Sequence, residues 1–255
     1  MVGTTVFPVS VNKFFAMRIN ATTGATEWVD GSIAATTGAS TSFSTCNYDD
    51  VARVCLIGSV SGQIHTSMIN VAKGTIPWQT LGVGPGASQS CMLANGDFVS
   101  SRFVTNATQD IEVTRRSGTN GAVLWTRVFD SPGSGKDTSV LIFADKFGNI
   151  YHVGRREFGS GLTSTFSTFI TKLLGSNGTV RWTYLYSPFS DANAEVESGG
   201  VSFDGSISFF GYYYNGQDAL GDANLVRIDQ INPDMPLSEL GTIPSLGTSN
   251  PKSGG

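Results

Sequence analysis

The chain has 255 residues, of which 14% are charged and 11% aromatic, with 31 glycines and a formal net charge of −4. So few charges favour short strands and tight turns over surface helices laced with ion pairs. The absence of any lysine or arginine block argues against nucleic acid and acidic membrane surfaces as partners. No apolar run approaches the roughly 18 residues of a membrane-spanning helix, and the first ten residues lack a secretory pattern, so we expect either a cytosolic protein or one whose leader has been removed.

A tryptophan-centred unit recurs along the chain. In four segments of equal length, tryptophan is the last residue and glycine stands four residues before it: 18–28, 68–78, 115–125 and 172–182. Glycine tolerates the positive φ that hairpin turns require, so each segment is predicted to form a strand, a turn and a strand. A fifth copy, 227–237, keeps the spacing but has Pro233 in place of the glycine and Leu237 in place of the tryptophan.

A second element alternates with the first. Its best copies are 145–154 and 202–211, with looser copies at 49–58 and 93–102, and each consists of a strand end, a turn and an apolar strand. Successive tryptophans are 50, 47 and 57 residues apart. Four short strands in a period of this length are typical of the blades of a β-propeller.

The segments DKFGNIYHVG (145–154) and FITKLLGSNGTVRWT (169–183) resemble the bacterial β-propeller repeat and, more loosely, the quinoprotein-like propeller repeat. The resemblance covers residues 14–237 and implies an all-β propeller of about five four-stranded blades. It implies no single activity, because this scaffold serves many roles.

We expect one domain, residues 1–248, with blade boundaries near 31, 82, 133 and 189, and a flexible tail at 249–255. The chain is predicted to begin inside a blade, with 4–10 as the second strand of the first copy. Closing the ring would then need an innermost strand from elsewhere, and 242–246 is available, although Pro244 removes a ladder donor. A closed ring made by this terminal strand exchange and a segment of a longer propeller or array both stay open.

The repeated tryptophans are predicted to fill gaps between neighbouring blades, with a carbohydrate-stacking ring as the alternative. Basic residues stand ten positions before most of these sites, and Met68 breaks the series. They are expected to pair locally rather than form a ring of positive charge. The basic positions are Arg18, Arg115, Lys172 and Arg227.

Few residues suggest catalytic chemistry. The only histidines, His65 and His152, fall at unlike strand positions and are expected to be satisfied by neighbours rather than to act as acid, base or metal ligand. Segment 131–139 (SPGSGKDTS) departs from a phosphate-binding loop and is read as a link between blades. Acidic residues at the turns of the second element are expected to bond backbone donors; they are Asp49, Asp50, Asp145 and Asp204. We therefore assign no catalytic, cofactor-binding or metal-binding residue, and expect no cofactor.

Cys46 and Cys55 flank one turn, and the predicted register places them opposite each other on adjacent strands, within reach of a disulfide. The alternative is two buried thiols. Cys91 has no obvious partner. Three N-glycosylation sequons begin at Asn20, Asn106 and Asn177.

The sequence thus predicts a non-catalytic propeller that serves as a structural or protein-interaction module in a cell-surface, secreted or filamentous assembly, as a glycoprotein located outside the cell or on its surface. The partner would be another protein or further copies of the chain, bound through blade loops such as 158–168 and 214–222. The alternative is a carbohydrate-binding protein or quinoprotein-like enzyme with a site at the central channel. A third possibility is one part of a longer repeat protein.

Overall fold

The computed structural model describes residues 2–7, 11–33, 41–48, 53–60, 63–82, 89–105, 109–129, 136–158, 165–186, 193–201, 206–214 and 222–228. Every regular element in these segments is a β-strand, so the all-β prediction is confirmed. None of the residues described forms a helix of the length and apolar character that crossing a membrane requires.

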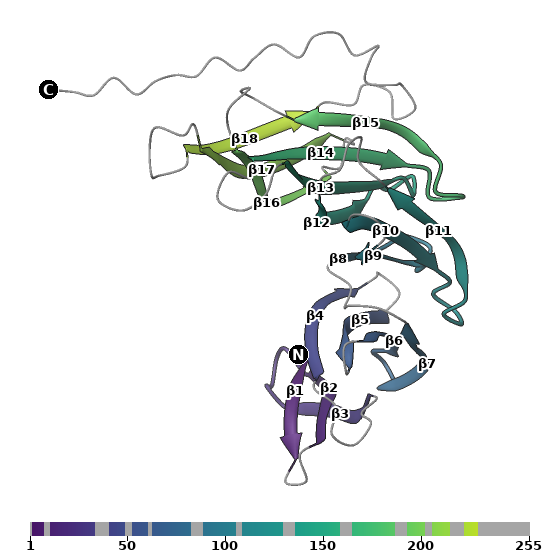
Figure 1. The fold of residues 1–255 in the computed structure, drawn as a ribbon. Coiled ribbons are helices and arrows are strands. Elements are labelled where there is room, and N and C mark those ends of the chain that lie inside the picture. The colour runs from purple at the N-terminus through teal and green to yellow at the C-terminus, as the bar shows by residue number, and fades with distance from the viewer. Residues whose placement is uncertain are drawn as a thin grey trace, which may run out of the picture.

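The strands form five antiparallel sheets in chain order (Figure 1). The first contains β1 (Val2–Phe7), β2 (Val11–Ile19) and β3 (Thr26–Ile33). The second contains β4 (Thr41–Tyr48), β5 (Arg53–Val60), β6 (Gln63–Asn70) and β7 (Thr75–Gly82). The third contains β8 (Gln89–Met92), β9 (Phe98–Thr105), β10 (Gln109–Arg116) and β11 (Val123–Phe129).

The fourth sheet contains β12 (Lys136–Ala144), β13 (Ile150–Phe158), β14 (Thr165–Leu173) and β15 (Val180–Tyr186). The fifth contains β16 (Asn193–Val201), β17 (Ile207–Tyr214) and β18 (Asp222–Ile228). In each sheet, strands adjacent in the chain pair with each other, so each sheet is a simple meander. Tryptophan lies on the last strand of each of the first four sheets.

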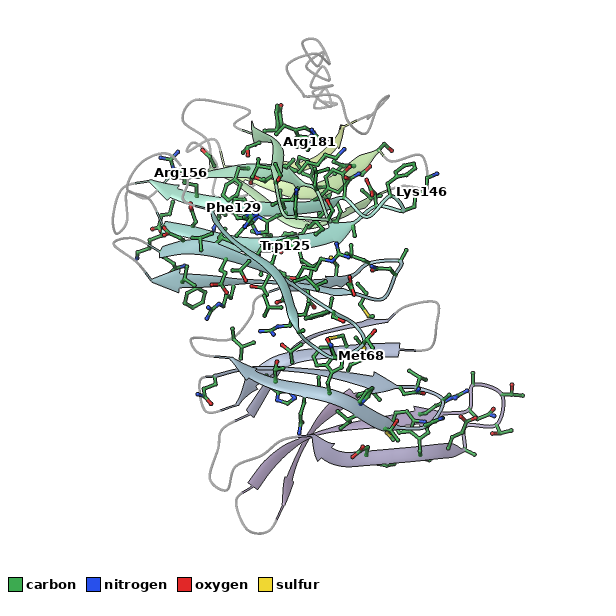
Figure 2. All side chains as sticks on the ribbon, turned by 90° about the vertical axis from the view of Figure 1, so that its right-hand side faces the viewer. Met68, Trp125, Phe129, Lys146, Arg156 and Arg181 are labelled. Atoms are coloured by element: carbon green, nitrogen blue, oxygen red, sulfur yellow. The ribbon has the colours of Figure 1, made fainter. Side chains whose placement is uncertain are left out.

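The sheets pack one on the next through their first strands. Strand β4 contacts β8, β8 contacts β12, and β12 contacts β16, while β1 and β2 contact β4. The first and fifth sheets lie at opposite ends of this stack in Figures 1 and 2. Residues 242–246, which were predicted to close a ring, lie outside the described segments.

Apolar residues on both faces of the inner strands fill the spaces between sheets, so neighbouring positions such as Phe98 and Val99 are both buried. One cluster joins the third and fourth sheets and includes Val99, Ile111, Ile150 and Leu173, all fully buried. A second cluster joins the fourth and fifth sheets around Tyr151.

Candidate functional site

The glycine of each tryptophan unit lies in the turn between the last two strands of its sheet. Their φ angles are 71°, 66°, 74° and 70° at Gly24, Gly74, Gly121 and Gly178. This left-handed region favours glycine because other residues carry a Cβ that crowds the backbone. The turn prediction is therefore confirmed for all four copies.

Each of three tryptophans reaches across to the turn of the following sheet. The indole Nε1 of Trp28 donates to the Val71 carbonyl at 2.8 Å, that of Trp78 to Gly118 at 3.0 Å, and that of Trp125 to Gly175 at 2.7 Å. Every acceptor stands seven residues before the tryptophan of its own sheet. The predicted role of these tryptophans between blades is confirmed, and the acceptors were not anticipated.

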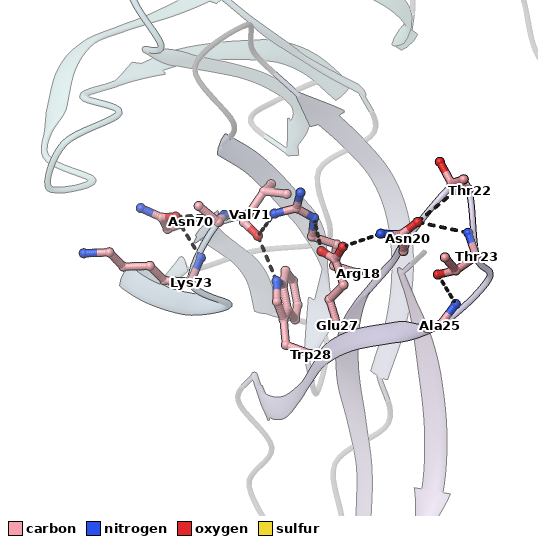
Figure 3. Close-up of polar contacts among 11 residues, drawn as sticks. Arg18, Asn20, Thr22, Thr23, Ala25, Glu27, Trp28, Asn70, Val71 and Lys73 are labelled. Atoms are coloured by element: carbon pink, nitrogen blue, oxygen red, sulfur yellow. Dashed lines mark hydrogen bonds and ion pairs between the residues drawn. The ribbon is translucent and has the colours of Figure 1, made fainter.

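The indole ring also covers the turn glycine of the following sheet. A Cβ at Gly74 would lie 2.8 Å from Trp28, one at Gly121 2.7 Å from Trp78, and one at Gly178 2.8 Å from Trp125. We call the glycine and the acceptor carbonyl of one turn its socket. The tryptophan, the socket and the contacts between them form a joint. Figure 3 shows the hydrogen bond by which Trp28 reaches the Val71 carbonyl of its joint.

Two of the basic residues ten positions before tryptophan take part in these joints. Arg18 donates to the Val71 carbonyl at 3.3 Å and forms an ion pair of 2.6 Å with Glu27. Arg115 donates to the Gly175 carbonyl and is paired with Asp97. Local pairing is thus confirmed for both arginines. Each guanidinium group donates to the same backbone carbonyl as the tryptophan of its sheet.

Asp97 connects two of the third sheet's turns, the β8–β9 turn and the β10–β11 turn. Besides Arg115, it accepts the Gly118 N–H at 3.0 Å and the Asn95 amide at 3.0 Å. Burial on its own would raise the pKa of Asp97, but these hydrogen bonds and the arginine charge hold it below the ordinary aspartate value. The carboxylate therefore stays ionised and orients the turn that receives Trp78.

A groove opens beside this network, between the turns of the third and fourth sheets. Its volume is about 590 Å³, and its lining includes Ala94 of the β8–β9 turn, Lys146 and Phe147 of the β12–β13 turn, Leu124 of β11 and Ser176 of the β14–β15 turn. Phe147 is 62% exposed and Leu124 50% exposed. The groove thus combines a cavity with large apolar side chains that face solvent.

The lining contains two cations, of which Arg115 is already paired with Asp97. Lys146 lies with its Nζ 5.2 Å from the centre of the Phe147 ring, a cation–π distance, and Arg115 also contributes to the lining. Of the described residues around this groove, Ser176 brings a hydroxyl, and none brings a carboxylate, an imidazole or a thiol. This lining suits an apolar group with a negative charge beside it better than acid–base chemistry.

Sequence reasoning missed this groove. It pointed to loops 158–168 and 214–222, whose residues 159–164 and 215–221 lie outside the described segments. Those loops join the second and third strands of their sheets, whereas the groove is built from turns at the other strand ends. The exposed Phe147 inside the DKFG turn was the available signal.

The histidines are buried within the sheets. His152 Nε2 lies 3.0 Å from the Ser139 hydroxyl, and its ring stacks on Phe129. Burial lowers the pKa of His152 to about 3 and that of His65 to about 4. Both imidazoles are therefore neutral at pH 7. A neighbour satisfies His152 at Nε2, whereas its buried Nδ1 has no hydrogen-bond partner among the described residues, so the expectation is confirmed for one ring nitrogen only.

The acidic turn prediction is confirmed at Asp145, whose carboxylate accepts the N–H groups of Phe147 and Asn149 at 2.9 and 2.8 Å. Asp49, Asp50 and Asp204 lie outside the described segments.

Lys136 begins strand β12, so the end of segment 131–139 leads from the third sheet into the fourth, as predicted for a link between blades.

The predicted cysteine register is wrong by one residue. Cys46 pairs with Leu56, and Cys55 pairs with Asn47. Next to the turn Tyr48 pairs with Val54, and this register continues unbroken to Thr45 and Ile57, so the slip arises at the turn rather than at the bulge between Phe43 and Thr45. A one-residue slip changes which face of a sheet a position occupies. The disulfide stays a prediction, which counting the reactive thiols of the unfolded, unreduced protein would test. Cys91 is buried, and its burial raises the pKa of the thiol to about 12.

Two sequons lie in described hairpin turns. Asn177 is exposed in the β14–β15 turn, where its side chain accepts the Thr179 N–H at 2.9 Å. Asn20 lies in the β2–β3 turn, and its side chain accepts the Thr22 and Thr23 N–H groups at 2.9 and 3.0 Å. Asn106 lies outside the described segments.

No protein-family model matches this sequence, and no curated protein matches it. Among solved structures, the chain is similar to the quinohemoprotein alcohol dehydrogenase ADHIIG of Pseudomonas putida HK5, with a TM-score of 0.46 and 13% identity over 88% of this chain and 40% of that one. The Dos1 propeller gives a TM-score of 0.49 and 7% identity over 86% of this chain and 56% of that one.

A quinohemoprotein alcohol dehydrogenase from Comamonas testosteroni gives a TM-score of 0.42 and 12% identity, over 88% of this chain and 41% of that one. The chain therefore spans 40 to 56% of the length of these three structures. The likeness is one of fold, to β-propeller proteins of low sequence identity.

Proposed function

We propose that the chain is a non-catalytic β-propeller module that binds a protein partner through the rim groove between its third and fourth sheets. The observation that carries the proposal is the exposure of Phe147 and Leu124, 62% and 50%, around a cavity of about 590 Å³. Large apolar side chains kept in contact with water around a hollow are a mark of interaction sites. An aromatic side chain at the centre of such a site supplies much of the binding energy.

The chemistry of the lining suggests the kind of partner. The apolar ring of Phe147 and the side chain of Leu124 favour an aromatic or branched apolar residue, and Lys146 favours a carboxylate beside it. A peptide segment with an aromatic residue flanked by aspartate or glutamate meets both requirements.

The proposal includes the architecture and setting of the module. The five sheets are assigned as five blades. The exposed turn of Asn177 offers room for a bulky sugar, which supports an extracellular or cell-surface setting. Mass spectrometry of protein from its native source would show whether Asn20, Asn106 or Asn177 carries glycans.

A random peptide library displayed on phage and selected on the full chain tests the groove. We expect selected peptides rich in aromatic and acidic residues, and at least about thirtyfold weaker binding of these peptides to Phe147→Asp, the loss expected for a central aromatic contact. Phe210→Asp is the matched control, because Phe210 is 47% exposed on β17 and does not line the groove.

Equal binding of the peptides to both variants and the parent chain would exclude the groove as the site. Binding to an array of glycans that Phe147→Asp leaves unchanged would favour the carbohydrate-binding alternative.

A further inference from the structure

The socket of the first sheet differs from the three filled sockets. Its glycine is Gly24, and its acceptor carbonyl, seven residues before Trp28, belongs to Ala21. Among the described residues, nothing lies within 4 Å of the position that a Cβ at Gly24 would take, whereas the other three glycines are each covered by an indole ring. In Figure 3 the turn from Asn20 to Ala25 points away from the joint that Trp28 forms.

The backbone of this turn nevertheless has the shape of a filled socket. The φ of Gly24 is 71°, within the range of the other three glycines. Its N–H donates to the Asn20 carbonyl at 2.9 Å, as the Gly121 N–H donates to Ser117 at 2.9 Å and the Gly178 N–H to Leu174 at 2.8 Å. The first sheet therefore presents a preformed surface on which an apolar side chain can pack.

The complementary half of a joint belongs to the fifth repeat unit, 227–237. Arg227 lies on β18 and stands where Arg18 and Arg115 stand in their units, and Leu237 stands where the tryptophans stand. The described part of this unit is at the opposite end of the stack from the first sheet (Figures 1 and 2). A contact within one chain would require the two ends to meet, while a contact between two chains requires no change in the stack.

We propose that the socket of the first sheet is a self-association site that receives the 227–237 unit of a second copy of this chain. Such a contact joins different surfaces of two identical chains, head to tail, and continues from one copy to the next until a ring closes or a filament forms. It repeats an interface that the chain already builds three times within itself.

The same chemistry then operates between copies. Arg227 of one copy donates to the Ala21 carbonyl of the next, as Arg18 does to Val71 and Arg115 to Gly175. The Leu237 side chain would cover Gly24, but unlike an indole it has no N–H to donate. This intermolecular joint is therefore the weakest of the series, which suits a reversible contact.

Sedimentation velocity of the full chain over a range of concentrations tests the proposal. We expect the sedimentation coefficient to rise with concentration, and Gly24→Asn to raise the dissociation constant at least about tenfold by filling the socket. Leu237→Trp, which supplies the missing donor, should lower it by a factor on the order of ten, the worth of one hydrogen bond.

Gly148→Asn is the matched control for folding. Gly148 also has a positive φ, 82°, and open surroundings, and asparagine is the side chain that best tolerates this region. Both asparagine variants should therefore lose the same small amount of stability, and Gly148→Asn should associate like the parent chain.

A parent chain that stays monomeric at its highest soluble concentration would overturn the proposal. If Gly24→Asn then unfolds far more readily than Gly148→Asn, the socket is filled within the chain and the ring is closed. If the two variants are equally stable, the socket is empty. Association that Gly24→Asn leaves unchanged would also overturn the proposal.

Discussion

Two joints in this molecule use the same residue types, a tryptophan and an arginine, but differ in how far these side chains are buried. Between the third and fourth sheets, Trp125 is 7% exposed and the side chain of Arg115 is 12% exposed. Between the first and second sheets, Trp28 is only half-buried and the side chain of Arg18 is 42% exposed. Each tryptophan nonetheless makes the same hydrogen bond to the same position of the next turn.

The difference shows that repeated geometry does not mean repeated stabilisation. Apolar surface stabilises the fold in proportion to the area removed from water, and an ion pair contributes little when solvent screens it. The inner joint should therefore hold its two sheets together more strongly than the outer joint.

Replacing the tryptophans gives the largest expected effect. Trp125→Ala should lower the free energy of unfolding by about 4 kcal/mol, because it removes a buried indole and leaves a cavity. Trp28→Ala should lower it by about half as much, since water already reaches that ring. Urea unfolding of both variants measures the two losses, and equal losses would contradict the difference between the joints.

Acid should act on the second and fourth sheets rather than the first, because the chain's two histidines are His65 on β6 and His152 on β13. Their lowered pKa values, about 4 and about 3, mean that the unfolded chain binds protons below pH 6.5 while the folded chain does not. Stability is thus complete above pH 6.5 and falls by about 1.4 kcal/mol per pH unit for each histidine.

The pair should therefore cost about 3 kcal/mol between pH 6.5 and pH 5, because the unfolded imidazoles are only half protonated at the upper limit. Urea unfolding at several pH values measures this slope, and His152→Gln should halve it whatever its effect at pH 7. A stability that does not change over this range would show that the imidazoles are protonated in the folded chain.

Alanine at the socket glycines compares a filled and an open turn. Gly178→Ala should cost about 3 kcal/mol, because the new Cβ would lie 2.8 Å from Trp125 and 2.9 Å from Arg127 in addition to adopting a positive φ. Gly24→Ala carries the positive φ alone and should cost about 1 kcal/mol in dilute protein. Thermal unfolding of the two variants in parallel measures the difference. A larger loss for Gly24→Ala would mean that the socket of the first sheet is covered more tightly than that of the fourth sheet.

The sequence predicts those features that need particular side chains, and it does not predict those that depend on the backbone alone. The spacing of glycine and tryptophan predicted the hairpin turns and the contacts between sheets, because a positive φ and a large ring at a fixed position need particular side chains. The acceptors Val71, Gly118 and Gly175 gave no signal, since each acts through a backbone carbonyl that any residue provides.

The groove and the cysteine register were missed for a different reason. Phe147, Leu124 and Ser176 are brought together by the packing of two sheets and have no spacing of their own. The register of Cys46 and Cys55 is the one set beside the β4–β5 turn, where Tyr48 pairs with Val54, and the turn geometry that fixes a hairpin register is not visible in residue spacing alone.

The smallest difference is expected at the arginines, for which Met68 in the second sheet provides a natural replacement. Arg115→Met should cost about 2 kcal/mol, because it leaves the carboxylate of Asp97 largely buried without its cation. Arg18→Met should cost less than about 1 kcal/mol, since its ion pair with Glu27 is exposed.

The lowered pKa of Asp97 stabilises the fold above the ordinary aspartate pKa, and this contribution is lost as the pH falls through the folded-state value. Urea unfolding between pH 5 and pH 3 should show that loss in the parent chain and in Arg18→Met, and a smaller loss in Arg115→Met. The same acid dependence in all three proteins would show that Arg115 does not set the charge of Asp97, and the two joints would then differ in burial alone.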